Sequence, residues 1–340
     1  MIPIEPILSG DRLALSQLLT QIENQTSDGQ EALSRLFAHT GRAYLIGITG
    51  APGTGKSSLV NRLAFFYRNP PQNQAPKRVA VVAVDPSSPF TGGALLGDRV
   101  RMQDLSGDSG VFIRSMASRG SLGGLATATA GLVQAFDAAG YELILIETVG
   151  AGQAEVDIAK LAHTTVVVEA PGLGDDIQAI KAGILEIADI LVINKADRPG
   201  VELTERALKG MLSLAHPVQR VFQHHGRTET VVSHMKEQDA DVPLWVPPIQ
   251  RTVATEGDGI PKVADLIEQH RQYLEQTGYL KNRERSRLEA ELNNLLQETL
   301  VSRWQNSVTD LIFQNVLDTL VARKISPFQA VGILLNGGRK

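Results

Sequence analysis

The sequence predicts an α/β fold in which helices cover both faces of a mostly parallel sheet, with further helices at each end of the chain. Between about 41 and 275, short β-branched runs alternate with stretches of helical periodicity, which is typical of a parallel sheet. One such run passes through a glycine-rich loop directly into a helix at 44–64. We therefore expect N-terminal helices over 1–40, the sheet domain over 41–275 and a C-terminal helical arm over 276–340.

Composition indicates a folded protein without a polyanion-binding surface. Of the 340 residues, 43% are hydrophobic and 21% are charged, and the formal net charge is −4. This balance argues against a disordered chain and against nucleic acid as a partner. The absence of cysteine excludes disulfides and thiolate metal sites. No signal-peptide pattern and no apolar run of roughly eighteen residues occurs, so we expect a cytoplasmic protein without a membrane partner.

The N-terminal region shows helical spacing that is interrupted once. Leucines recur at helical intervals from Leu13, the stretch Thr26–Gly29 breaks the run, and the spacing resumes at Ala32. This pattern predicts two short helices. The strands that we expect after them lie at 44–48, 79–84, 142–147, 164–169, 190–194 and about 249–254, with a further edge strand at 111–114.

The C-terminal region, from about 281 onward, carries apolar stripes on charged helices. The stripes are formed by Leu288, Leu292, Leu295, Leu296 and Leu300, and then by Leu311, Val316, Leu317 and Leu320. Either the parent domain or a second copy of the chain must cover them. Their distance along the chain from the glycine-rich loop favours a helical dimerisation arm.

The glycine-rich loop Gly50–Ser57 is a complete P-loop between a strand and a helix. Its glycines let backbone N–H groups surround phosphates, and the helix N-terminus adds a partial positive charge. Lys56 is expected to reach the β- and γ-phosphates, and Ser57 to bind Mg²⁺. The predicted contacts with the nucleotide here are Gly50, Ala51, Pro52, Gly53, Thr54, Gly55, Lys56, Ser57 and Ser58.

Asn194–Asp197 closes a buried strand and has the N-K-x-D arrangement that recognises guanine. The Asp197 carboxylate can accept from guanine N1–H and the exocyclic amine together, a donor pair that adenine lacks. Thr252–Ala254 lies where a loop would offer backbone N–H groups to guanine O6. The predicted base contacts are Asn194, Lys195, Asp197, Val253 and Ala254.

Several further residues are candidates for a magnesium site and for nucleotide-dependent switches. Glu147 ends a strand and can hold Mg²⁺ through water, while Gly150 allows a backbone N–H to approach the γ-phosphate. Asp85 and Asp98 supply two more oxygen ligands, or are solvated loop carboxylates. Lys181 pairs with one of these carboxylates, or is a solvated helical lysine.

Together these motifs resemble the metallochaperone-type GTPases, and within them the MeaB/ArgK branch, the GTPases associated with methylmalonyl-CoA mutase. The motifs that carry the resemblance are Gly50–Ser57, Val84–Ser88, Thr91–Gly93, Gly97–Arg99, Glu147–Gln153 and Asn194–Asp197. The likeness extends over nearly the whole chain, including the C-terminal helices.

The resemblance implies a P-loop GTPase domain that binds GTP or GDP with Mg²⁺. It further implies a chaperone that gates cofactor loading into an adenosylcobalamin-dependent acyl-CoA mutase and protects that enzyme. Such proteins are typically homodimers, with switch segments here at about 85–104, 147–157 and 171–183. The likeness also groups Asp85, Asp98, Glu147 and Lys181 as the magnesium and switch cluster, which with Lys56 forms the expected catalytic set.

Two other functions are compatible with these motifs. One, implied by a label that the resembled branch has also carried, is a nucleotide-dependent kinase associated with lysine/arginine/ornithine transport, although no phosphoacceptor site stands out. The other is a nucleotide-bound adaptor without measurable turnover. Phosphate transfer to protein would indicate the kinase, and GTP-insensitive partner binding would indicate the adaptor.

Overall fold

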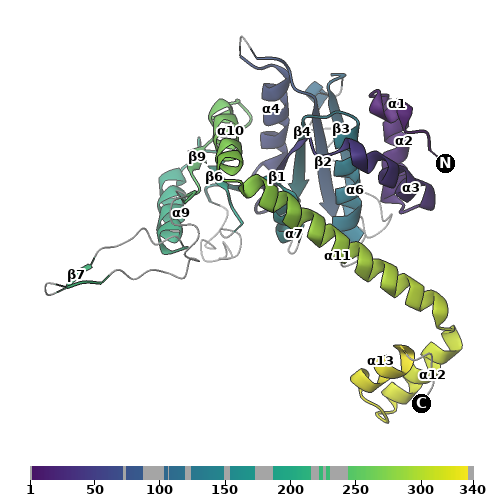
Figure 1. Cartoon of the computed structure of the whole chain (residues 1–340). Helices are drawn as coiled ribbons and strands as arrows, with labels where there is room; N and C mark the ends of the chain where they lie inside the picture. Colours follow the sequence, from purple (N-terminus) through teal and green to yellow (C-terminus); the bar gives the residue numbers. More distant parts are fainter. Residues whose placement is uncertain are drawn as a thin grey trace. The chain divides into compact units, whose positions relative to one another are not determined.

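A parallel sheet forms the core of the larger of two compact units in the structure, a computed structural model (Figure 1). The structure describes residues 2–71, 74–86, 103–105, 107–118, 124–148, 154–172, 187–215, 222–224, 227–229 and 244–335. By its contacts the chain divides into two compact units, Met1–Arg287 and Leu288–Lys340. Each unit is described separately below.

In the described part of the first unit, seven strands pair in the order β3-β2-β4-β1-β5-β6-β9, and every pairing is parallel. This confirms the predicted parallel sheet, including the edge position of the strand that begins at Val111. The strands are β1 (Tyr44–Thr49), β2 (Val79–Pro86), β3 (Val111–Ser118), β4 (Leu143–Thr148), β5 (Thr164–Glu169), β6 (Ile190–Ile193) and β9 (Ile249–Arg251). A separate antiparallel pair is formed by β7 (Phe222–His224) and β8 (Arg227–Glu229).

Successive side chains of the central strands enter different cores, because a strand alternates its side chains between the two faces of a sheet. In β1, Leu45 packs with α6 and α7, whereas Ile46 and Ile48 pack with α4 and α10. Both faces are therefore buried, which explains the nearly continuous apolar runs. The helices that pack on the two faces of the sheet are α4 (Lys56–Arg68), α6 (Gly124–Ala138), α7 (Ala154–Leu161), α9 (Val201–Ala215) and α10 (Ile260–Gln276). The first unit also contains the short 3-10 helix η2 (Gln103–Leu105).

The N-terminal helices pack against α6 and belong to the first unit (Figure 1). They are α1 (Glu5–Leu8), α2 (Arg12–Glu23), α3 (Ser27–Leu36) and η1 (Phe37–His39). The expectation that Thr26–Gly29 interrupts the helical run was wrong in its position. Thr26 is the N-cap of α3, its Oγ1 accepting from the Gly29 N–H at 3.2 Å, so Ser27 onward is already helical.

The C-terminal helices are α11 (Tyr279–Ser307), α12 (Asp310–Val321) and α13 (Pro327–Leu335). Within the second unit, α12 packs on α13, and Val316 and Ala330 are buried. The Trp304 indole N–H donates to the Leu334 carbonyl at 3.3 Å. Across the residues that the structure describes, no helix combines the length and the apolar composition that crossing a bilayer requires.

Candidate functional site

The loop between β1 and α4 passes so close to its neighbours that two of its glycines have no room for a side chain. A Cβ on Gly50, whose φ is +139°, would lie 2.1 Å from the Val168 carbonyl oxygen. A Cβ on Gly55, whose φ is +91°, would lie 2.4 Å from Asn194 Nδ2. Both glycines also have the left-handed backbone conformation that side chains disfavour. The local geometry therefore requires glycine at two positions of the P-loop motif.

Two residues of the P-loop motif, Lys56 and Ser57, begin α4. The buried Lys56 donates through Nζ to the Gly50 carbonyl at 2.8 Å and to the Ala51 carbonyl at 3.0 Å. Ser57 Oγ donates to Glu147 Oε1 at 2.6 Å. The pairing of β1 with β4 brings Glu147 there, since Ile48 and Glu147 are partners in the register. The structure therefore brings together three of the residues predicted for the phosphate and magnesium end of the site.

Asn194 connects the P-loop with the loop that follows β9. Its Nδ2 donates to the Thr54 carbonyl at 2.8 Å. Its Oδ1 accepts from Thr252 Oγ1 at 3.1 Å and from the Ala254 N–H at 3.0 Å. The side chain is buried, so these bonds are shielded from water. The two loops that the sequence predicts for phosphate and for base are thus held by one amide group.

The rest of the N-K-x-D motif lies at the same edge of the sheet. Lys195 has a positive φ of 57° and donates through Nζ to the Gly53 carbonyl at 2.6 Å. Asp197 is exposed. Val253 is buried and donates its N–H to the Asp258 carbonyl at 3.1 Å. The Asp197 carboxylate is therefore accessible to a ligand beside the fixed P-loop.

Other predicted residues lie outside the described part of the chain. The backbone of Asp85 belongs to the end of β2, but its side chain is not described. Asp98, Gly150 and Lys181 lie wholly outside the described residues. Their roles stay predictions.

Sequence reasoning missed one residue that contacts the base loop. Arg62, on α4, donates through Nε to the Ala254 carbonyl at 3.2 Å and through Nη2 to the Thr255 carbonyl at 2.7 Å. An arginine on an amphipathic helix gives no signal of its own, because its usual place is the solvated face. Only the tertiary fold shows that its partners are loop carbonyls.

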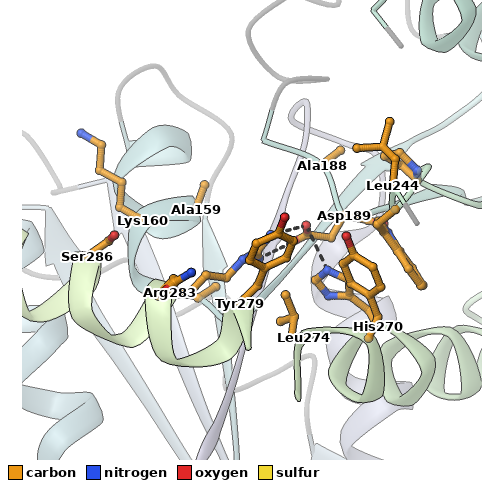
Figure 2. A pocket seen from close by; sticks show the side chains of 15 residues that line it. Ala159, Lys160, Ala188, Asp189, Leu244, His270, Leu274, Tyr279, Arg283 and Ser286 are labelled. Carbon is orange, nitrogen blue, oxygen red and sulfur yellow. Dashed lines mark hydrogen bonds and ion pairs between the residues drawn. The ribbon is translucent and has the colours of Figure 1, made fainter. Parts of the chain in front are cut away.

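A hollow of about 480 Å³ lies at the amino ends of β5 and β6, and Figure 2 shows the side chains that line it. The P-loop, in contrast, follows the carboxyl end of β1. Arg283 donates to both oxygens of Asp189 at 2.7 and 2.8 Å, and His270 Nε2 lies 3.3 Å from Asp189 Oδ1. His270 is buried, and this desolvation lowers its pKa to about 4. Its Nδ1 also lies within hydrogen-bond distance of Thr164 Oγ1, at 2.8 Å. These groups are engaged with one another rather than with the nucleotide loops.

Comparison with known proteins identifies relatives along most of the chain. Residues 15–309 match the family described as methylmalonyl Co-A mutase-associated GTPase MeaB. A putative GTPase of Pyrococcus abyssi is 43% identical over 335 residues, which cover 98% of this chain and 94% of the relative. The Mus musculus protein named methylmalonic aciduria type A homolog, mitochondrial, is 29% identical over 97% of this chain and 77% of its own length.

A solved structure shares the fold. The crystal structure of LAO/AO transport system kinase superposes with a TM-score of 0.66 at 24% sequence identity, covering 98% of this chain and 95% of that one. At this identity the likeness supports the architecture alone. The family match and the Pyrococcus relative go further, and they agree with the P-loop and the N-K-x-D motif: the chain belongs to the MeaB family of methylmalonyl-CoA mutase-associated GTPases.

Proposed function

We propose that this GTPase uses guanine-nucleotide binding and hydrolysis to gate cofactor loading into an adenosylcobalamin-dependent acyl-CoA mutase and to protect that enzyme. The main support for guanine-nucleotide binding is that the Asn194 side chain forms hydrogen bonds both with the P-loop and with the loop predicted to contact the base. The mutase part is supported by the family's description and by the name of the mouse relative.

In the proposed reaction, the protein acts by positioning and by neutralising charge. Lys56 would exchange its bonds to the loop carbonyls for the β- and γ-phosphate oxygens, and backbone N–H groups at the start of α4 would donate to the same oxygens. The Asp197 carboxylate selects guanine. Charge that develops as water attacks the γ-phosphate is thereby stabilised by groups that are already in place.

The residues beside the P-loop suit a magnesium ion. Ser57 Oγ and the Glu147 carboxylate are hard oxygen donors 2.6 Å apart, the type of ligand that Mg²⁺ prefers. When bound, the ion would offset negative charge on the phosphates. We propose that Ser57 holds it directly and that Glu147 does so through water. Asp85 and Asp98 are proposed as additional ligands, and Lys181 as their cationic partner in the switch.

We also propose that the C-terminal arm joins two copies of the chain. The second unit exposes large apolar side chains, including Leu311 at 72%, Phe328 at 89% and Leu335 at 67%. A surface of this kind is costly in water and is stabilised by a partner face. We also propose that the chain has three functional parts, namely N-terminal helices over 1–40, the GTPase domain over 41–275 and the dimerisation arm over 276–340.

The test is GTP hydrolysis by the full chain, measured with and without an adenosylcobalamin-dependent acyl-CoA mutase. We expect slow intrinsic turnover that the mutase stimulates, and a loss of about 10²–10³ in kcat in Lys56→Ala. Stimulation that persists in Lys56→Ala would point to a contaminating GTPase. If the mutase changes neither turnover nor nucleotide affinity, the proposed partner is wrong while the GTPase activity stands.

The same assay separates the two other functions. Released inorganic phosphate supports hydrolysis, whereas labelled phosphate retained on protein would support a transport-associated kinase. Mutase binding that is identical with GTP, with GDP and without nucleotide would support a nucleotide-bound adaptor.

A further inference from the structure

We infer that Arg62 is a positioning residue for base selection, which holds the loop after β9 so that a backbone N–H faces O6 of guanine and excludes adenine. The inference rests on the proposed binding of guanine at this site. The sequence predicts Val253 and Ala254 as the base contacts of this loop, but in the structure their N–H groups donate to the Asp258 carbonyl and to Asn194 Oδ1, so the inference concerns the next residue, Thr255. It adds a residue on α4, the helix that begins at the P-loop, to the determinants of nucleotide choice.

The first step is the way in which the loop is held. Its turn is closed internally, because the Val253 carbonyl accepts from the N–H groups of Glu256 and Gly257, each at 3.0 Å. Two side chains then attach this turn to the rest of the site. Asn194 binds it through the Ala254 N–H, and Arg62 binds the carbonyls of Ala254 and Thr255.

The second step follows from peptide geometry. In a trans peptide the N–H points away from the preceding C=O. Since the Ala254 carbonyl accepts from Arg62, the Thr255 N–H of the same peptide points away from that guanidinium. Among the described residues, this N–H donates to no protein acceptor, whereas the Ala254 N–H is already bonded to Asn194. Thr255 thus offers the loop's available donor next to the Asn194 contact.

Guanine and adenine differ in the group that this N–H would meet. Guanine presents an acceptor at position 6, and adenine presents an amine donor there. A fixed N–H therefore attracts guanine and opposes adenine, while a loop free to rotate its peptides discriminates less. Arginine suits this task because its planar fork bonds two carbonyls at once in a defined orientation.

The experiment compares the affinities of full-length Arg62→Met for GTP, ITP and ATP. ITP keeps O6 and N1–H but lacks the 2-amino group. We expect GTP and ITP to lose affinity by the same factor, roughly fivefold to tenfold, while ATP affinity stays unchanged. Arg62→Lys, which keeps the charge but not the fork, should fall between wild type and Arg62→Met. Arg206→Met removes an exposed cation elsewhere and should match wild type.

Asp197→Asn provides the contrasting pattern. Its carboxylate is proposed to accept from N1–H and the 2-amino group, so this variant should compress the GTP-to-ITP ratio, which Arg62→Met leaves unchanged. Equal losses for GTP, ITP and ATP in the Arg62 variants, or no loss for any of them, would overturn the inference alone. A wild-type protein that binds ATP as tightly as GTP would overturn the proposed base site together with the inference.

Discussion

At the residue scale, Asn194 gives one buried amide two tasks, since its nitrogen bonds the P-loop and its oxygen bonds the base loop. A displacement of either loop therefore strains the Asn194 hydrogen bonds that hold the other loop. Gly55 belongs to the same arrangement, because a side chain there would meet the Asn194 amide. Phosphate binding and base binding are structurally connected through this side chain.

Asn194→Ala is expected to weaken GTP binding roughly 100-fold, since it removes bonds to both loops that are each worth about 1 kcal/mol. Calorimetric titration of the folded variant measures this loss. Asn194→Asp is the matched control, because it keeps an oxygen acceptor for Thr252 and Ala254 but loses the donor to Thr54. It should retain part of the affinity, and equal losses in the two variants would contradict the two-sided role.

Ser57→Ala is expected to raise the Mg²⁺ concentration that supports half-maximal GTP binding, roughly tenfold to 100-fold, because the hydroxyl is the proposed direct ligand. Titrating Mg²⁺ at fixed GTP measures this shift. Binding in excess chelator serves as the control and should be alike in the variant and the wild type. An unchanged magnesium requirement would place the ion on other oxygens.

The local parts of the site could be predicted from sequence, and its tertiary parts could not. Gly50–Ser57 and Asn194–Asp197 are short contiguous motifs, so a few neighbouring residues are enough to predict phosphate binding and guanine binding. Arg62 contacts carbonyls 192 and 193 positions away, and no local pattern encodes that pairing. The bond from Ser57 to Glu147 likewise depends on the pairing of β1 with β4.

At the scale of elements, a chain of polar side chains, three buried and one partly exposed, connects the amino ends of β5 and β6 with α10 and α11. It comprises Thr164, His270, Asp189 and Arg283, and Figure 2 shows the last three of them. Asp189 also accepts from the Thr165 N–H at 2.8 Å. Such a chain is stable only while its members keep their hydrogen bonds and their charge states.

Acidification is therefore expected to destabilise the first unit through His270. The pKa of His270 in the folded protein is about 4, below its ordinary value of 6.5, because burial disfavours the imidazolium. The unfolded chain takes up the proton first, so stability falls as pH drops from about 6.5 to about 4, by up to about 3 kcal/mol. Below pH 4 this group contributes no further change.

Urea unfolding at several pH values, compared between wild type and His270→Gln, measures this contribution. The glutamine side chain cannot take up the proton, so the variant should have a flatter dependence of unfolding free energy between pH 6.5 and 4. Parallel curves for the two proteins would show that the acid sensitivity arises from other groups.

The predicted elements agree closely with the observed strands because burial on both faces leaves unmistakable apolar runs, as in β1 and β4. The N-terminal helices were harder to delimit, since Ser27, Asp28 and Gly29 look like breakers. In the structure, Thr26 caps α3, and Gly29 lies so close to α2 that a Cβ would be 2.9 Å from the Gln21 carbonyl carbon. The same residues thus begin a helix and allow it to pack.

At the scale of the whole molecule, the exposed apolar side chains of the second unit predict that two copies of the chain associate through this unit. In full-length protein, Leu311→Lys together with Phe328→Lys is expected to convert a dimer into a monomer, because charges on that face oppose its burial. Light scattering coupled to size exclusion measures the mass. Leu13→Lys alters another leucine, 70% exposed, in the first unit, and should leave the mass unchanged. A wild-type monomer would favour folding of the arm onto its own domain.

The order of the strands in the sheet also determines when each strand can first pair as the chain is synthesised. β1, which carries the P-loop, takes its neighbours from far downstream: Tyr44 pairs with Leu143, and Ile46 with Thr164. At roughly 5–20 residues per second, a ribosome needs on the order of 5–20 s to supply the first of these partners. Until then this apolar strand lacks both of its neighbours in the sheet, and the bonds from Thr252 and Ala254 to Asn194 cannot form before Ala254 has been synthesised. The growing chain therefore exposes an apolar strand for several seconds, during which it is prone to associate with other unfolded chains.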